Sequence, residues 1–90
     1  MNRLKNGYGL VSSDILRNPD ISLREKGLYA YLATYADSKG EITASINKMT
    51  TECGITQSTV KRTLEKLKKK NIIAREFRGI GTSFKTILIK

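Results

Sequence analysis

Histidine is absent from the 90-residue sequence and cysteine occurs once, so several kinds of site are excluded together. Disulfide frameworks need paired cysteines, structural zinc sites need Cys and His ligands, and the common nucleophile–base arrangements need histidine. The eight carboxylates show no paired spacing, and there is no glycine-rich phosphate loop. We therefore expect a protein that is not an enzyme, with no metal site, no cofactor and no small-molecule substrate.

Long apolar runs are also missing. No stretch of about 18 apolar residues is present to cross a membrane, and residues 1–9 lack the apolar segment of a secretory signal. The lone Cys53 is typical of a reducing compartment. These features predict a cytoplasmic protein with no membrane partner, folded as a single small domain over residues 1–90 with a flexible segment at residues 1–8.

Positive charge is unevenly distributed along the chain. Seventeen Lys and Arg against eight Asp and Glu give a net charge of +9. Residues 1–55 carry seven basic and six acidic side chains, whereas residues 56–90 carry ten and two, so the net charge is +1 on the first part and +8 on the second. Clustered cations repel one another unless an anion relieves the repulsion, which indicates a polyanionic partner. Nucleic acid and a membrane surface are the two candidates, and of these we expect nucleic acid. The alternative is a solvated face that only keeps the protein dispersed.

The first half of the chain contains two helix signals. Residues 10–18 mix apolar positions with a Ser-Ser-Asp run and predict a short helix that Asn18 and Pro19 end. Ser22 and Glu25 have the spacing of a capping box, which predicts the start of a longer helix. Apolar residues then recur at three- and four-residue spacing, at Leu28, Tyr31, Leu32 and Tyr35. We interpret these tyrosines as core or rim packing and not as platforms for bases.

The middle of the chain predicts a strand, two helices and a tight turn between them. Residues 41–43 are long enough only for a short strand that pairs with a later one. Ser45 is a suitable N-cap for a helix with Ile46, Met49 and Cys53 on its apolar face, which makes Cys53 a buried small hydrophobe. Gly54 can end this helix in the left-handed conformation, and Thr56 can cap the next one.

The last part of the chain predicts a helix followed by a hairpin. A helix over residues 57–70 buries Val60, Leu64 and Leu67 and presents a polar, basic face. Asn71 ends it, and residues 72–78 and 83–89 are two β-favouring runs separated by residues 79–82.

This order of elements is similar to that of winged helix-turn-helix domains of bacterial, phage and plasmid replication initiators and regulators. Residues 45–73, SINKMTTECGITQSTVKRTLEKLKKKNII, closely resemble the helix-turn-helix core of that family, and the resemblance extends over residues 9–89. The matching positions are Ser45, Gly54, Thr59-Val60, Leu67 and Ile72-Ile73. Thr50 departs from the pattern, because the family usually has alanine there. The resemblance implies an α+β, mainly α fold: a three-helix core and a C-terminal two-stranded wing.

The way a helix lies in the major groove of DNA suggests a role for each candidate residue. Side chains at the N-terminal end of a helix in the major groove come closest to base edges, so the candidate base readers are Gln57, Ser58 and Lys61. The candidate contacts to phosphates or through the wing are Ser45, Thr56, Thr59, Arg62, Arg75, Arg78 and Lys85, with Ile80 at the wing tip. For each residue the alternative is a local role, such as starting a helix or packing an Arg stem. The lysines within residues 66–70 are interpreted as electrostatic background near a helix C-terminus.

Two classes of function stay open at this point. The first is sequence-specific binding of double-stranded DNA, as a small transcriptional regulator or as the origin-binding domain of a plasmid or phage replication protein. The second is a winged-helix docking module that binds an acidic protein surface in a replication or mobile-element assembly. A homodimer is also left open, with the region around Tyr29 and Tyr31 as its seam.

Overall fold

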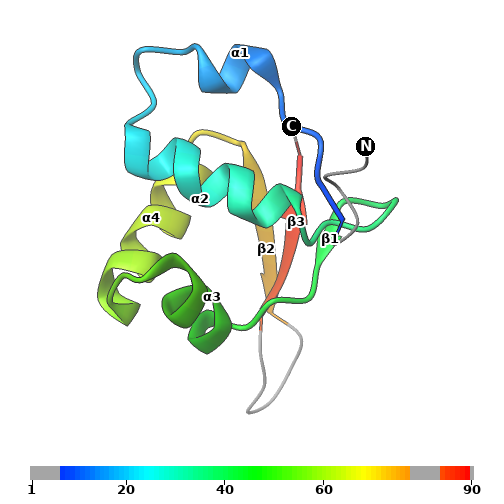
Figure 1. The fold of residues 1–90 in the computed structure, drawn as a ribbon, viewed down its shortest axis with the longest axis vertical. Helices are drawn as coiled ribbons and strands as arrows, with labels where there is room; N and C mark the ends of the chain where they lie inside the picture. The colour runs from blue at the N-terminus through cyan, green and yellow to red at the C-terminus, as the bar shows by residue number, and fades with distance from the viewer. Residues whose placement is uncertain (1–6, 78–83, 90) are drawn as a thin grey trace, which may run out of the picture.

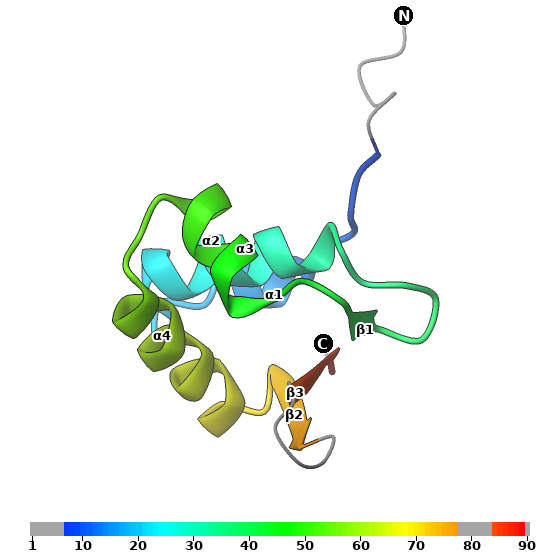
Figure 2. The ribbon, with the colours of Figure 1, turned by 90° about the horizontal axis from the view of Figure 1, so that it is seen from below.

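The protein is mainly helical, with one small antiparallel sheet. The computed structural model describes residues 7–77 and 84–89. In chain order the elements are α1 (Ser13–Leu16), α2 (Leu23–Ala33), β1 (Glu41–Ile42), α3 (Ile46–Cys53), α4 (Gln57–Lys69), β2 (Ile73–Phe77) and β3 (Phe84–Leu88). The helices α2, α3 and α4 gather on one side of the molecule and the strands on the other (Figures 1 and 2). This is an α+β arrangement, as the sequence predicts.

Each helix begins at a serine or threonine whose hydroxyl accepts a hydrogen bond from the backbone three residues on. At α2 the Glu25 N–H donates to Ser22 Oγ at 3.1 Å, and the Ser22 N–H donates to the Glu25 carboxylate at 2.9 Å. This reciprocal pair confirms the predicted capping box. Ser45 and Thr56 cap α3 and α4 as predicted. Ser12 caps α1, which falls within the predicted residues 10–18.

The sheet has the strand order β1-β3-β2, and both pairs are antiparallel. The short strand expected near residue 41 therefore pairs with β3, with Glu41 opposite Ile87. Gly40 precedes β1 at a φ of +79°, and a Cβ atom there would lie 2.8 Å from the Leu88 carbonyl oxygen. Only glycine satisfies both the backbone angle and this close approach.

The hydrophobic core lies between α2, α3, α4 and the sheet. The predicted core residues of α4 are almost completely inaccessible to solvent: Val60, Leu64 and Leu67 are 0%, 1% and 0% exposed. Met49 of α3 and Leu32 of α2 pack into the same cluster. Cys53 is half-buried and packs against this cluster from its edge.

Tyr29 belongs to the core, and this overturns its suggested place in a dimer seam. The side chain has 0% exposure, and its hydroxyl oxygen accepts a hydrogen bond from the Ser12 N–H at 2.7 Å. The ring thus joins α2 to the start of α1 inside the protein. Tyr31 is half-buried at the rim of the core, as the helical spacing predicts.

An ion pair joins the first turn of α2 to the end of α4. Lys70 Nζ lies 2.8 Å and 3.0 Å from the two carboxylate oxygens of Glu25 and also donates to the Asp20 carbonyl at 2.9 Å. The Glu25 side chain is 4% exposed and that of Lys70 is 37% exposed. Burial acts to raise the pKa of Glu25, but the hydrogen bonds from Lys70 and Ser22 and the charge of Lys70 outweigh it, so this pKa lies below its ordinary value.

The ion pair makes a testable contribution to stability. Lys70→Met leaves a buried carboxylate without its cation, and we expect a loss of about 1–2 kcal/mol in the free energy of unfolding. This is less than for a fully buried pair, because Lys70 is partly exposed and hydrated. Glu25→Gln retains the oxygen that accepts from the Ser22 N–H and replaces the oxygen 2.8 Å from Lys70 Nζ with an NH2 group. It leaves no buried charge, so its loss is expected to be smaller. Urea unfolding at neutral pH measures both.

The pH dependence provides the control. The pKa of Glu25 is depressed in the folded state, so its contribution is present above its ordinary pKa of 4.5 and is lost as the pH falls through the lower folded value. Below pH 4.5 we therefore expect the difference between wild type and Glu25→Gln to shrink. A difference that is constant down to pH 2 would show that the ion pair does not stabilise the fold.

Candidate nucleic-acid interface

The turn between α3 and α4 places the two helices at a fixed angle. Gly54 ends α3 in the left-handed conformation, with φ +70° and ψ +30°, and its N–H donates to the Thr50 carbonyl at 3.0 Å. A Cβ atom on Gly54 would meet nothing within 4 Å, so the backbone angle and not crowding requires glycine here. Thr56 then begins α4 two residues later. The predicted helix, turn and helix are confirmed.

Helix α4 has an apolar face in the core and a long basic face in solvent. Its exposed residues are Gln57, Ser58, Lys61, Arg62, Glu65, Lys66, Lys68 and Lys69. Glu65 is the one acidic side chain among them. The first turn of α4 contains no acidic residue, so the positive end of its dipole is not neutralised from within the helix. An anion is favoured at this end for that reason.

The three predicted base readers lie together near the start of α4. Gln57, Ser58 and Lys61 are all exposed, in the first and second turns of the helix. Ser58 Oγ lies 3.3 Å from Thr56 Oγ1, and the side chains of Gln57 and Lys61 make no hydrogen bond to another described residue. Their polar groups are therefore available to an external partner. Their assignment to base edges remains a prediction.

The predicted phosphate contacts near the turn also have structural roles. Ser45 and Thr56 accept capping hydrogen bonds from the backbone of Lys48 and Thr59 at 3.1 Å and 3.3 Å. Thr59 Oγ1 lies 2.8 Å from Thr56 Oγ1, and Arg62 donates to it at a long 3.4 Å. A hydroxyl that caps a helix can still meet a phosphate, because it has both a donor and lone pairs.

The basic residues of β2 and β3 are described to different extents. Arg75 lies on β2 and is half-buried. Burial lowers the pKa of its guanidinium below the ordinary value, although the charge of Glu65 on α4 acts in the opposite direction. Lys85 lies on β3 opposite Glu76, and the course of its side chain falls outside what the structure describes. Arg78 and Ile80 lie outside the described residues. The predicted roles of these residues on DNA are not tested by the structure.

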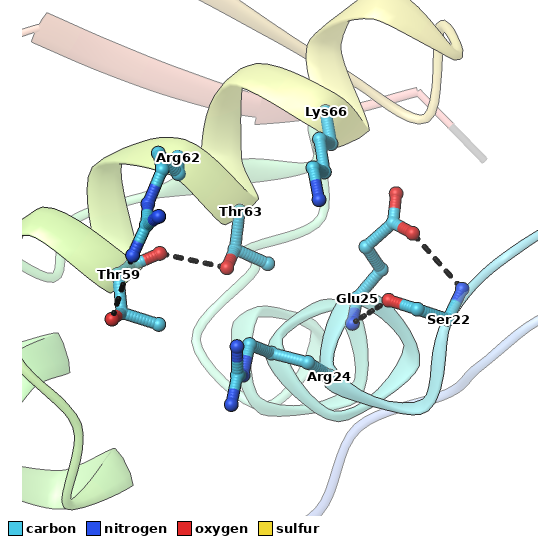
Figure 3. Close-up of a pocket in the computed structure, with 7 residues that line it drawn as sticks. All are labelled: Ser22, Arg24, Glu25, Thr59, Arg62, Thr63 and Lys66. Carbon is cyan, nitrogen blue, oxygen red and sulfur yellow. Dashed lines mark hydrogen bonds between the residues drawn. The ribbon is translucent and has the colours of Figure 1, made fainter.

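A second basic group was not found from the sequence. Arg24, in the first turn of α2, lines a cleft of about 230 Å³ together with Arg62 and Lys66 of α4 (Figure 3). In the sequence, Arg24 lies inside the predicted capping box, and Lys66 belongs to the lysines that we interpret as electrostatic background. No sequence signal joins them, because their proximity depends on how α2 packs against α4 across nearly forty intervening residues.

Two tyrosines connect α2 to α3 away from this cleft. The hydroxyls of Tyr31 and Tyr35 both donate to one carboxylate oxygen of Glu52, at 2.6 Å for Tyr31. Burial and the hydrogen bond to Glu52 raise the pKa of Tyr31, and the two tyrosines lower that of Glu52. The rings meet edge to face with centroids 5.3 Å apart. This is rim packing that holds α3 in place.

Neither a cluster of metal-binding side chains nor a membrane-spanning helix is found among the described residues. Within residues 7–77 and 84–89, no three or more His, Cys, Asp or Glu side chains come together as a metal site would require. No helix in this part of the chain has the length and apolar character needed to cross a bilayer.

Comparison with protein families identifies the class. Residues 20–73 match the model of a helix-turn-helix domain, from the residues before α2 to the first residue of β2. The chain therefore belongs to this helix-turn-helix family. The match contains the turn at Gly54 and all of α4, the parts that such domains use to bind DNA. Searches of curated proteins and of solved structures returned no match.

The turn gives a direct test of how α4 is held. Gly54→Ala must place a Cβ in the left-handed region, so we expect a loss of about 1–2 kcal/mol in the free energy of unfolding. Gly54→Asn is the matched control, because asparagine tolerates this region better, and its loss should be clearly smaller. Thermal unfolding of the two variants compares them. Equal losses would mean that the left-handed angle is not what requires glycine.

Proposed function

We propose that this protein binds double-stranded DNA in a sequence-dependent manner, as a winged helix-turn-helix domain with α4 as its recognition helix. The observation that carries the proposal is the exposed start of α4, where Gln57, Ser58 and Lys61 face solvent and the first turn contains no acidic residue. The fold holds this end in position through the Gly54 turn and the Thr56 cap. We propose a binding function and no catalytic one.

The major groove suits such a helix in size and chemistry. A helix with its side chains is about 10–12 Å across, and the groove is about 12 Å wide. Glutamine can bind the N6 and N7 edge of adenine, lysine the O6 and N7 edge of guanine, and serine several edges. Gln57, Lys61 and Ser58 are therefore proposed to read bases.

Phosphate contacts would supply most of the affinity. The net charge of +8 on residues 56–90 supports this, because phosphate neutralisation releases counterions. We propose Ser45, Thr56, Thr59 and Arg62 as contacts around the start of α4. The proposed wing contacts, to phosphates or the adjacent minor groove, are Arg75, Arg78, Ile80 and Lys85.

Selection of bound fragments from a random duplex library tests the proposal. It also distinguishes a transcriptional regulator from an origin-binding domain. Enrichment of one sequence supports specific binding. A palindromic consensus would indicate a dimeric regulator, and direct repeats would indicate an origin-binding domain. Recovery without any sequence preference would contradict the proposal.

A docking module is the second candidate, and one observation favours it. Leu23 at the start of α2 is 84% exposed, beside a groove that Leu28, Tyr31 and Ile55 also line. Such apolar surface is suited to a protein partner. The two functions differ in the measurements below, because a docking module binds DNA only through weak, non-specific electrostatics.

The salt dependence is the first measurement. If about 5 to 7 phosphates are neutralised, the slope of log K against log salt concentration should be about −5 to −6. Fluorescence anisotropy with a labelled duplex between 50 and 200 mM salt, about the range over which such contacts lose their affinity, gives this slope. A slope shallower than about −2 would mean that the basic face of α4 does not meet DNA.

The second measurement separates base reading from folding. Gln57→Ala and Lys61→Ala should each cost about 1–3 kcal/mol on the selected duplex and much less on random DNA, because the phosphate contacts persist. Their melting temperatures should stay close to that of the wild type, since alanine is favoured at exposed helix positions.

The control for this measurement is Val60→Ala. Val60 is completely buried in the core, so the variant should lose about 1–3 kcal/mol of stability through lost burial. Unchanged specificity in both the Gln57 and Lys61 variants, with folding intact, would remove α4 as the reader and favour the docking module.

A further inference from the structure

The cleft between α2 and α4 gathers three cationic side chains. Arg24 comes from the first turn of α2, and Arg62 and Lys66 come from successive turns of α4. Figure 3 shows them around the space between the two helices. The cleft has a volume of about 230 Å³, which at roughly 30 Å³ per water holds an anionic group and several waters.

The positive charge of this cleft is not neutralised by ion pairs within the part of the chain that the structure describes. Arg24, Arg62 and Lys66 are exposed, and none of them forms an ion pair with another described residue. Glu25 is the one carboxylate among the described residues that line the cleft. Its side chain is buried and already paired with Lys70 at 2.8 Å. The three cations therefore repel one another in the absence of an external anion.

The position of the cleft on α4 indicates which anion. Thr59, Arg62 and Lys66 are three, four and seven residues apart, so they share the flank of α4 that faces α2. Glu65 lies on another side of the helix, where its charge acts on Arg75 of β2. A helix in the major groove has one sugar–phosphate strand along each flank. With α4 in the major groove, the cleft would face the strand on the α2 side.

We propose that this cleft binds a backbone phosphate of DNA through Arg24, Arg62 and Lys66. This inference rests on the proposed function and adds to it a contact from α2, outside the helix, turn and helix. Each guanidinium can donate two parallel hydrogen bonds to phosphate oxygens, and Lys66 adds a point charge.

The ion pair of Glu25 and Lys70 gives the cleft its shape. Lys70 follows Lys66 by one helical turn, and Glu25 follows Arg24 directly in α2. Because the pair fixes the first turn of α2 against the end of α4, it sets the separation of Arg24 and Lys66. Glu25 and Lys70 are thus positioning residues. Thr63 is buried in the same wall, and its hydroxyl donates to the Thr59 carbonyl at 2.7 Å.

The test compares charge-neutral variants inside and outside the cleft. Arg24→Gln and Lys66→Gln remove one cleft charge each, and Lys39→Gln removes one exposed charge from the turn before β1. That turn lies on the opposite side of the molecule from α4 (Figures 1 and 2). The probe is a 20-bp duplex of arbitrary sequence, because phosphate contacts are independent of sequence.

We expect Arg24→Gln and Lys66→Gln each to weaken binding roughly threefold to tenfold at 100 mM salt and to make the salt slope shallower by about 0.9. Lys39→Gln should change neither quantity by a comparable amount. Circular dichroism melting should show all three variants folded, since the changed side chains are exposed.

The outcomes separate this proposal from the proposed function. If Arg24→Gln and Lys66→Gln bind like Lys39→Gln while library selection still finds a preferred sequence, only the cleft proposal is wrong. If selection finds no preferred sequence but the cleft variants weaken binding, only the specificity fails. No binding of the wild type to any duplex overturns both.

Inorganic phosphate distinguishes a strand contact from a small-anion site. Titration of the wild type, followed by amide chemical shifts at constant ionic strength, should show no saturation below about 1 mM, because a single phosphate lacks the contacts along α4 that a DNA strand makes. Saturable binding in that range that Arg24→Gln abolishes would overturn the assignment to the DNA backbone.

Discussion

The buried carboxylate of Glu25 is the contact on which the arrangement of the helices depends. One oxygen accepts from the Ser22 N–H and completes the cap of α2, and both oxygens lie within 3.0 Å of Lys70 at the end of α4. A carboxylate this buried is costly unless it is paired and hydrogen-bonded, so the two helices are held in the one arrangement that satisfies it. A single side chain therefore couples the start of α2 to the placement of α4 and its exposed face.

Local interactions explain why much of the fold could be predicted from the sequence. The caps at Ser22, Ser45 and Thr56 and the left-handed Gly54 depend on atoms three or four residues apart, and the residue types record them directly. The apolar spacing of Val60, Leu64 and Leu67 likewise places the core face of α4. The candidate base readers follow from the same periodicity, because they occupy positions of α4 that do not face the core.

What the sequence did not reveal depends on packing between distant segments. Tyr29 was grouped with Tyr31, although only the former is completely buried, because helical periodicity does not tell which of two neighbouring tyrosines meets α1. Arg24 and Lys66 share a cleft only once α2 lies on α4. Lys70 looked like one more lysine in a basic run, and its pairing with Glu25 spans 45 residues.

The segment that matches the family model forms part of its sheet with a strand outside the match. The match ends at residue 73, yet β1 lies within it and pairs with β3, which lies beyond it. Leu88 N–H donates to the Gly40 carbonyl at 2.7 Å, and Gly40 has no room for a side chain against Leu88. Residues 40–42 are therefore shaped to receive β3. β3 also pairs with β2 along its length, so it lies between β1 and β2 in the sheet. β1 precedes α3 in the chain and β2 follows α4, so both neighbours of β3 connect it to the helices. Because β2 follows α4 in the chain and packs against it, and β3 pairs with both β1 and β2, the three strands and α4 form one body.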